Sequence, residues 1–266
     1  MSRSQSEHST WPRWRAVIFR VVVPARYASS RLPGKPLVPL AGKPMIQWVV
    51  ERAQRSSAQQ VVVATDDERI ARIARAFADV QMTSAGHPSA TDRLAEVAAI
   101  RGWRDEELLV NLQGDEPLMP PSLIDQVAEL LAAHSSTDIA TLAVPLQSSA
   151  ELYDPNVVKV VTDLSQRALY FSRAPIPFDR DVAGTFAHAR RHMGLYAYRV
   201  GALKKLAAAP PSALEELEKL EQLRALEHGM EIRVALAVAI PGGDVNTASD
   251  IPRVEALLAA GNQSLP

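Results

Sequence analysis

The strongest chemical signal in the sequence is a set of three cationic side chains within ten residues: Arg26, Arg31 and Lys35. They stand in the stretch PARYASSRLPGKPL, residues 24–37, directly after a short apolar run. Gly34 allows the backbone to approach a ligand closely, and Pro33 and Pro36 stiffen the loop around it. Guanidinium groups bind phosphate oxygens in pairs, and a lysine adds a mobile point charge. The stretch is therefore suited to a triphosphate and a departing pyrophosphate, although a solvated basic loop has the same composition.

A second polar turn, NLQGDEP at residues 111–117, contains a candidate metal ligand. Asp115 comes just after a predicted buried strand, where its carboxylate can hold Mg²⁺ against nucleotide phosphates. An ordinary Gly-Asp-Glu-Pro turn has the same local sequence, so this motif alone leaves both interpretations open.

Short apolar runs alternate with amphipathic segments through the first half of the chain. They predict strands at residues 17–23, 60–64, 80–83, 107–112 and 138–144, and helices at residues 43–55, 67–78, 91–101 and 121–133. This alternation predicts an α/β fold with a mainly parallel sheet that is covered on both faces. In such sheets ligands bind beyond the carboxyl ends of the strands, where both polar turns described above would lie.

The second half predicts a different arrangement. Strands are expected at residues 157–162, 168–172, 192–200 and 232–240, and helices at residues 214–228 and 251–260, with Ser212 as the N-cap of the first helix. The segment of about residues 156–200 therefore reads as a β-rich insertion. Because no long linker interrupts the chain, residues 16–266 are predicted to form a single domain. Residues 1–15 are polar, Ser-rich and aperiodic, and we expect a disordered extension there.

The composition excludes several classes of protein. Among 266 residues, 47% are hydrophobic, and 29 basic residues balance 30 acidic ones to a net charge of −1. A general nucleic-acid binder would carry a marked positive excess. The chain has no cysteine, which excludes disulfides and thiolate chemistry. The apolar run 234–240 is far shorter than the ~20 residues that span a bilayer, and Arg20 interrupts the only apolar run near the N-terminus. We therefore expect a cytoplasmic protein without membrane insertion.

Seven segments together resemble one enzyme family. In order they are PARYASSRLPGKPL, ATDD (64–67), NLQGDEP, NVVKVV (156–161), YFSRAPIP (170–177), RHMGLYAYR (191–199) and LEKLEQLR (217–224). Over about residues 19–258 the chain is similar to the 3-deoxy-manno-octulosonate cytidylyltransferases, also called CMP-Kdo synthetases. The resemblance implies a three-layer nucleotide-diphospho-sugar transferase fold with a smaller insertion for sugar binding and dimerisation. It also implies transfer of CMP from CTP to 3-deoxy-D-manno-octulosonate (Kdo) for lipopolysaccharide biosynthesis, Mg²⁺ dependence and a homodimer.

The resemblance also assigns site residues. It places Arg26, Arg31 and Lys35 on the CTP phosphates, Ser89 to Arg93 near the cytosine, and Asp115 on the metal, with Arg26, Lys35 and Asp115 as the catalytic set. The residues assigned to the Kdo pocket are Gln113, Arg173, His192, Tyr196, Glu221 and Gln222. Kdo carries a carboxylate and several hydroxyls, which cations and mixed donors and acceptors would recognise. Taken singly, His192 and Tyr196 could be ordinary half-buried residues, and Glu221 a solvated helix residue.

Two positions depart from the family pattern. Asn246 stands where the family has an aspartate that helps to bind a second Mg²⁺, and Asp244 lies two residues earlier. An extended segment would separate these positions by ~6–7 Å, so replacing the carboxylate would require loop movement. Ala90 replaces a glycine, which would matter if that backbone required positive φ or a very close approach of the base. The alternatives are a cytidylyltransferase for a related acid sugar, such as an 8-amino Kdo analogue or a sialic acid, and a nucleotide-binding relative with impaired catalysis.

Overall fold

The computed structural model describes residues 17–28, 32–182 and 184–262. For residues 261 and 262 it describes only the helix backbone. The predicted extension at residues 1–15 and the predicted phosphate ligand Arg31 lie outside the described residues. No helix in the described ranges combines the length and apolar character that crossing a bilayer requires.

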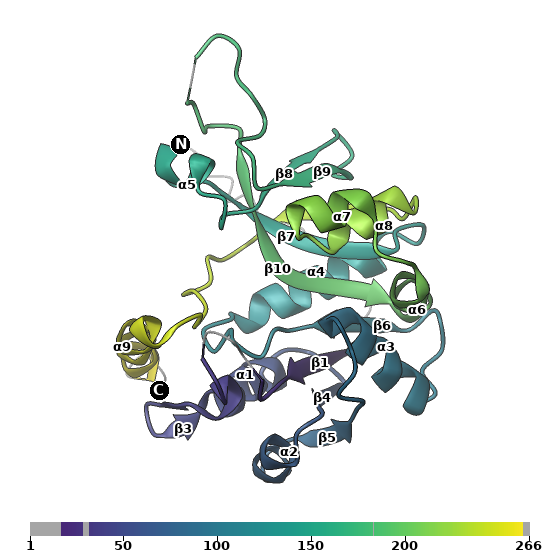
Figure 1. Ribbon diagram of the computed structural model, residues 1–266, viewed down its shortest axis with the longest axis vertical. Helices are drawn as coiled ribbons and strands as arrows, with labels where there is room; N and C mark the ends of the chain where they lie inside the picture. The colour runs from purple at the N-terminus through teal and green to yellow at the C-terminus, as the bar shows by residue number, and fades with distance from the viewer. Residues whose placement is uncertain (1–16, 29–31, 183, 263–266) are drawn as a thin grey trace, which may run out of the picture.

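A nine-stranded mixed sheet runs through the molecule (Figure 1). Seven strands form its main path in the spatial order β11 (Ile232–Leu236), β7 (Ile139–Pro145), β10 (Arg190–Arg199), β6 (Leu108–Asn111), β1 (Phe19–Ala25), β4 (Gln60–Thr65) and β5 (Asp79–Met82). All of these strands run in one direction except β10, which is antiparallel to both β6 and β7. The predicted α/β class with a mainly parallel sheet is confirmed.

Helices cover both faces of this sheet (Figure 1). Residues Val21 and Val23 of β1 pack on one face with α1 (Met45–Gln54) and α4 (Pro121–Ala132). Val22 points the other way, into a core formed by α3 (Ala90–Ile100), α6 (Val200–Ala208) and α8 (Gln222–Glu227). Because successive side chains of a strand alternate between faces, burial on both sides explains the continuous apolar runs in the sequence. A further helix, α2 (Glu68–Ala74), follows β4 and is capped by the side chain of Asp67.

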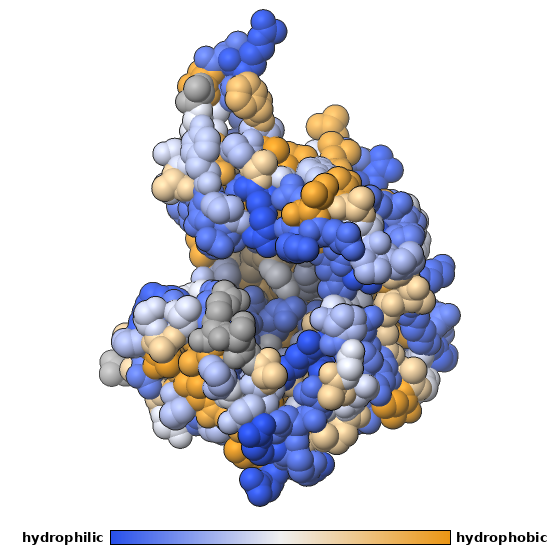
Figure 2. All heavy atoms as spheres, in the orientation of Figure 1, coloured by the Kyte–Doolittle hydropathy of each residue, from blue (hydrophilic) through white to orange (hydrophobic). Residues whose placement is uncertain are grey.

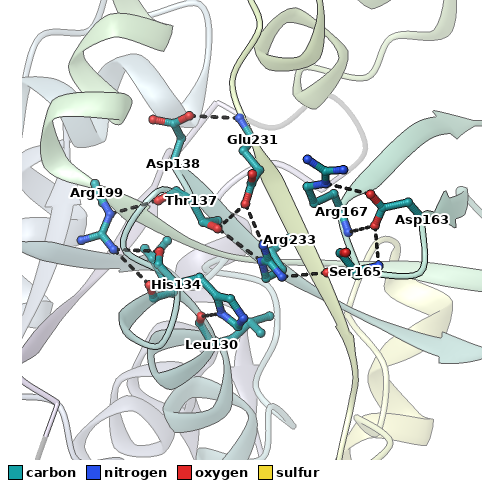
Figure 3. A network of polar contacts seen from close by, with 11 residues as sticks. Leu130, His134, Thr137, Asp138, Asp163, Ser165, Arg167, Arg199, Glu231 and Arg233 are labelled. Carbon is teal, nitrogen blue, oxygen red and sulfur yellow. Dashed lines mark hydrogen bonds and ion pairs between the residues drawn. The ribbon is translucent and has the colours of Figure 1, made fainter.

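The second half adds an antiparallel hairpin to β10, made of β8 (Lys159–Thr162) and β9 (Ala168–Ser172), after the short helix α5 (Ser149–Tyr153). The turn between β8 and β9 covers the free edge of β11 (Figure 3). There the amide of Val234 donates to the carbonyl of Gln166 at 2.8 Å, and Arg233 Nη1 donates to the carbonyl of Ser165 at 2.7 Å. Since unpaired edge groups invite pairing with other chains, this turn protects the sheet. The single-domain division with an insertion at 156–200 stays a prediction.

The predicted helix at residues 214–228 is wrong in one respect, because the structure has two helices there. The first is α7 (Ala213–Glu218), and Lys219 then takes a left-handed conformation, with φ 53° and ψ 47°, before α8 begins. The apolar spacing continues across the break, so the sequence pattern hides it. Ser212 is the N-cap of α7, as predicted, and its amide donates to the Glu215 carboxylate at 3.2 Å.

Other elements also differ from the prediction. The helices α5 and α6 were not predicted, and β11 ends at Leu236 rather than at residue 240. Beyond that end, Val238 and Ile240 are exposed, so their apolar character does not report a buried strand.

The C-terminal helix α9 (Ile251–Asn262) returns to the first half of the chain. It packs on the start of α1 and on the hairpin of β2 (Pro39–Leu40) and β3 (Lys43–Pro44), through Leu40, Trp48, Val254 and Leu258. Val245 belongs to the same cluster, and its amide donates to the carbonyl of Asp115 at 3.1 Å. The packing of α9 therefore holds residues 241–250, which include the short 3₁₀ turn η2 (Ala248–Asp250), beside the turn that follows β6.

Candidate active site

The turns that follow β1 and β6 meet because these two strands are parallel neighbours in register. Arg26, Lys35 and Asp115 all line one cavity of about 340 Å³ at this edge of the sheet, together with Gln113 and Ala90. Three of the residues predicted to act on one triphosphate are therefore brought together, although they come from separate parts of the sequence.

Gly114 makes the close approach of the two turns possible. A Cβ atom added at this position would lie 2.7 Å from the carbonyl oxygen of Pro24 at the end of β1. Contacts that short do not occur for real Cβ atoms, so any other residue would push the turns apart. The glycine thus sets the spacing between the loop of Arg26 and the turn of Asp115.

A short 3₁₀ turn, η1 (Lys35–Leu37), begins at Lys35. The preceding residue, Gly34, has φ 69°, and its amide donates to the carbonyl of Tyr27 at 3.0 Å. The side chain of Lys35 is mostly buried, and its Nζ lies 2.6 Å from Oδ2 of Asp115. The ion pair holds an ammonium and a carboxylate together at the wall of the cavity.

Arg26 ties the first loop to the segment that precedes α3. Its Nη2 donates to the carbonyls of His87 and Ser89 at 2.6 and 2.9 Å. Burial, with Arg93 nearby, lowers the pKa of Arg26 from its usual value. Both bonds use one nitrogen, and Nε and Nη1 make no bond to another residue of the described ranges, so their N–H groups are available for a phosphate.

The predicted cytosine-side residues divide into two groups. Ser89 caps α3, and Ala90, the first residue of that helix, lines the cavity without the left-handed φ that would penalise a side chain. The concern about positive φ at Ala90 therefore does not apply. Arg93 is fully buried and does not line the cavity; its Nη2 lies 3.2 Å from Asp66 Oδ2, and its Nη1 donates to Thr83. It holds the end of β4 against α3.

A second cavity, of about 460 Å³, lies on the side of β10. Three residues assigned to the sugar line it, His192, Tyr196 and Gln222, together with Glu116, Asp244 and Asn246. A smaller cavity of about 100 Å³ shares Ala90 and Gln113 with the first cavity and Tyr196 and Gln222 with the second. The three cavities therefore adjoin one another. Figure 2 shows the surface deeply hollowed between the part that carries β8 and β9 and the part that carries β3.

His192 is uncharged in this setting. Burial lowers the pKa of its imidazole to about 3, and Nε2 lies 3.0 Å from the hydroxyl of Thr141. Its ring packs edge-on to Phe171 and beside Tyr196, with centroid distances of 4.9 and 5.2 Å. A neutral imidazole offers a Kdo carboxylate a hydrogen bond but no positive charge. Burial also raises the pKa of Tyr196 well above its usual value, so its hydroxyl stays protonated.

Glu221 and Gln222 stand at the start of α8, directly after the left-handed break. Gln222 is buried, and Glu221 Oε1 lies 3.0 Å from the hydroxyl of Ser89. Burial raises the pKa of Glu221. The alternative of a solvated helix residue is therefore wrong for Glu221, which faces α3 across the small cavity.

Arg173 is directed elsewhere. Its Nε donates to the carbonyl of Glu218 at 2.6 Å and its Nη1 to the carbonyl of Pro155 at 2.7 Å. It is absent from the lining of the three cavities described above. Its contacts hold the turn before α8, and the structure does not bring it together with the other residues assigned to the sugar.

Asp244 and Asn246 are in direct contact, since Asn246 Nδ2 donates to Asp244 Oδ2 at 2.6 Å. The two side chains thus converge in this loop, and the need for loop movement to replace the missing carboxylate stays a prediction. Within the described residues no group of three or more His, Cys, Asp or Glu side chains could hold a metal alone. Mg²⁺, however, commonly uses one or two carboxylates together with substrate phosphates and water. Asp115 in the first cavity and Asp244 and Asn246 in the second offer oxygen donors of that kind, and the bond from the Val245 amide to the Asp115 carbonyl joins the two segments.

Comparison with known proteins decides the family. Residues 20–232 match the cytidylyltransferase family. The chain is 55% identical to the 3-deoxy-manno-octulosonate cytidylyltransferase of Thioalkalivibrio sulfidiphilus over 91% of this chain and 99% of that protein. It is 54% identical to the enzyme of the same name from Pseudomonas fluorescens, over 91% and 98% of the two chains. The chain belongs to the 3-deoxy-manno-octulosonate cytidylyltransferase family.

Solved structures agree with this assignment. The structure of a CMP:2-keto-3-deoxy-manno-octonic acid synthetase complexed with CTP matches with a TM-score of 0.85 and 42% identity, covering 92% of this chain and 99% of that one. A cytidylyltransferase from Leptospira borgpetersenii matches with a TM-score of 0.59 at 16% identity, over 92% and 87% of the two chains, which shows a shared fold alone. The predicted nucleotidyltransferase-like fold of the family is confirmed.

Sequence reasoning missed Glu116 as a member of this site. Its Oε2 atom is buried and has no hydrogen-bond partner among the described residues. Burial, together with Asp115 and Asp244, raises the pKa of Glu116 to about 8, so this carboxyl is mostly protonated at neutral pH. The only signal in the sequence is its place between Asp115 and Pro117, which does not distinguish it from a solvated turn residue.

Proposed function

We propose that this protein transfers CMP from CTP to Kdo, giving CMP-Kdo and pyrophosphate for lipopolysaccharide biosynthesis. One observation carries the proposal: Arg26, Lys35 and Asp115 line a single cavity that adjoins the cavity of His192 and Tyr196. Two adjoining cavities, one cationic and one lined with donors and acceptors, suit a nucleotide and an acid sugar. The names of the relatives and of the CTP-bound neighbour supply the two substrates.

The residues on the wall of the first cavity suit an in-line displacement. The anomeric hydroxyl oxygen of Kdo attacks the α-phosphorus of CTP while the bond to the bridging oxygen of pyrophosphate breaks. Arg26 and Lys35 bind the phosphate oxygens and stabilise the negative charge that builds up on the leaving group. Gln113, Gln222 and Glu221 orient the sugar hydroxyls by hydrogen bonds. No side chain becomes covalently attached to a substrate.

We further propose that the reaction depends on Mg²⁺. Asp115 would be the main protein ligand, with Asp244 and Asn246 as further ligands. When bound, Mg²⁺ neutralises phosphate charge and lowers the pKa of the attacking hydroxyl. Lys35, which already pairs with Asp115, keeps the carboxylate oriented toward the cavity.

The proposal also includes a homodimer in the cytoplasm. The segment between β9 and β10 projects from the body of the molecule (Figure 1), and within it Phe178 and Val182 are 81% and 60% exposed. Apolar side chains on a projecting arm are suited to cover a second copy. Light scattering after size exclusion checks this point, and the double variant Phe178→Ser with Val182→Ser should shift the mass toward a monomer.

A pyrophosphate-release assay tests the reaction directly. CTP, Kdo and Mg²⁺ should give steady release, whereas ATP or UTP in place of CTP should give little. Replacing Kdo with its 8-amino analogue or with a sialic acid tests the choice of sugar. Faster pyrophosphate release with either sugar than with Kdo would identify that sugar as the substrate instead. Binding of CTP without any product would instead indicate a relative that has lost catalysis.

A further inference from the structure

Ser89 forms hydrogen bonds with residues that line two different cavities. Ser89 caps α3 beside the nucleotide-side cavity, and its Oγ lies 3.0 Å from Oε1 of Glu221 on α8. The two residues are 132 positions apart. On the other side, the carbonyl of Ser89 accepts a bond from Arg26 at 2.9 Å. A continuous chain of bonds therefore runs from the loop of Arg26, through Ser89, to the start of α8.

The Ser89 hydroxyl has one proton and two carboxylate neighbours. Asp92 Oδ2 lies 2.6 Å away within its own helix, and Glu221 lies across the small cavity. One proton can be donated to only one acceptor at a time, so the hydroxyl has two discrete arrangements. An element with two discrete arrangements that both sites contact is what energetic coupling between sites requires.

Each end of the chain reaches a different cavity. Arg26 lines the cavity with Lys35 and Asp115, so a phosphate bound there acts on the same guanidinium that holds the Ser89 carbonyl. Glu221 lines the small cavity next to Gln222, which in turn lines the larger cavity on the side of β10. A ligand in either cavity therefore meets a residue that is hydrogen-bonded to Ser89.

We infer that Ser89 is a positioning residue that couples nucleotide binding to sugar binding through Glu221. Occupation of either cavity then increases the affinity of the other, and by linkage the factor is the same in both directions. This inference rests on the proposed function, because it takes CTP and Kdo as the two ligands.

The experiment measures the dissociation constant of α,β-methylene-CTP by calorimetry, with Mg²⁺ present, without and with saturating Kdo. The methylene bridge prevents release of pyrophosphate, so both ligands stay intact. The ratio of the two constants is the coupling factor. Ser89→Gly removes the hydroxyl but keeps a residue that is tolerated at an N-cap. We expect the coupling factor to fall by about 3- to 10-fold in this variant.

A second variant, Asp92→Ala, removes the competing acceptor of the Ser89 hydroxyl and changes no residue that lines the three cavities. If the choice between the two carboxylates carries the coupling, Asp92→Ala should lower the factor as well, and Ser89→Gly should have no further effect on the factor in the Asp92→Ala background. If Ser89→Gly binds α,β-methylene-CTP more weakly but its coupling factor equals that of the parent, the role of Ser89 is merely structural and the inference is overturned. A parent protein whose affinity for the nucleotide does not change with Kdo would also overturn it. Failure of the proposed function looks different, since the parent would then bind no nucleotide and release no pyrophosphate from CTP.

Discussion

The ammonium of Lys35 lies 2.6 Å from the carboxylate of Asp115, although the two residues are 80 positions apart in the sequence. Their side chains are 11% and 33% exposed, so Asp115 keeps an open side while Lys35 is almost enclosed. An enclosed cation beside a partly open carboxylate suits a site where a phosphate and a metal meet. Loss of either member should impair the reaction more than the fold.

Lys35→Met should lower the rate of pyrophosphate release by about 10²- to 10³-fold, because the preorganised positive charge that stabilises the leaving pyrophosphate is lost. The matched control is Lys43→Met, since Lys43 pairs with Glu51 at 2.7 Å on the adjacent hairpin and does not line the cavity. The control should keep nearly full activity. Parent-like turnover in Lys35→Met, with a folded protein by circular dichroism, would contradict the assigned role.

Gly114→Ala should destabilise the protein by about 1–3 kcal/mol and reduce activity, because the added methyl meets the Pro24 carbonyl. Gly86→Ala is the control, since a Cβ there makes only an ordinary contact at 3.5 Å with Ser84. Thermal denaturation and pyrophosphate release should separate the two variants. Equal behaviour would show that the turns after β1 and β6 need no such close approach.

Asp244→Asn should raise the Mg²⁺ concentration for half-maximal activity by about 10-fold, because a carboxylate beside the site is lost. Asn246→Asp should lower that concentration, since it adds a charge at the position where the family has an aspartate. Displacement of Mn²⁺ by Mg²⁺, followed by electron paramagnetic resonance, gives a second measurement that does not depend on turnover. Superimposable titrations of the parent and both variants would rule out a role for this loop in metal binding.

The half-buried imidazole of His192 should make the protein less stable in mild acid. The pKa of His192 is lowered from 6.5 to about 3, so between these values the unfolded chain binds a proton that the folded chain does not. The free energy of unfolding therefore falls as the pH falls through this window, by up to about 1.4 kcal/mol per pH unit. Urea unfolding at several pH values measures this slope. In the His192→Gln variant this slope should lack the contribution of up to one proton. A slope equal to that of the parent would mean that His192 titrates normally.

Lys219→Gly should stabilise the protein by about 1 kcal/mol, because the left-handed conformation seen there costs free energy for a residue that has a Cβ atom. The control is Glu216→Gly in the adjacent helix α7, which should cost about 1 kcal/mol. Both residues are exposed, so the two variants differ mainly in backbone conformation. Destabilisation by both substitutions would show that the break at Lys219 is not left-handed.

The first half of the fold could be predicted because its strands and helices are set by local patterns. The apolar run that forms β1 and the turns around Lys35 and Asp115 are each readable within about ten residues. Their convergence follows from the parallel sheet, since neighbouring parallel strands end at the same edge.

The remaining errors have non-local causes. The break at Lys219 does not disturb the apolar spacing, and tertiary packing of α8 decides it. The neutrality of His192 and Glu116 depends on burial by elements from elsewhere in the chain, which spacing does not report. The position of Arg173 was assigned by resemblance, and its side chain instead binds the carbonyls of Glu218 and Lys219, in a turn that sequence alone did not reveal, and the carbonyl of Pro155.

The place of β10 in the sheet has a consequence for how the chain is made. In the described sheet β6 and β7 each pair with β10, and not with each other, so residues 190–199 join the two halves. While the ribosome is still synthesising the segment before Arg190, β7 has neither of its neighbours in the sheet, because β10 and β11 both follow it in the sequence. The nascent protein therefore exposes one edge of β6 and both edges of β7 until β10 pairs with the two strands.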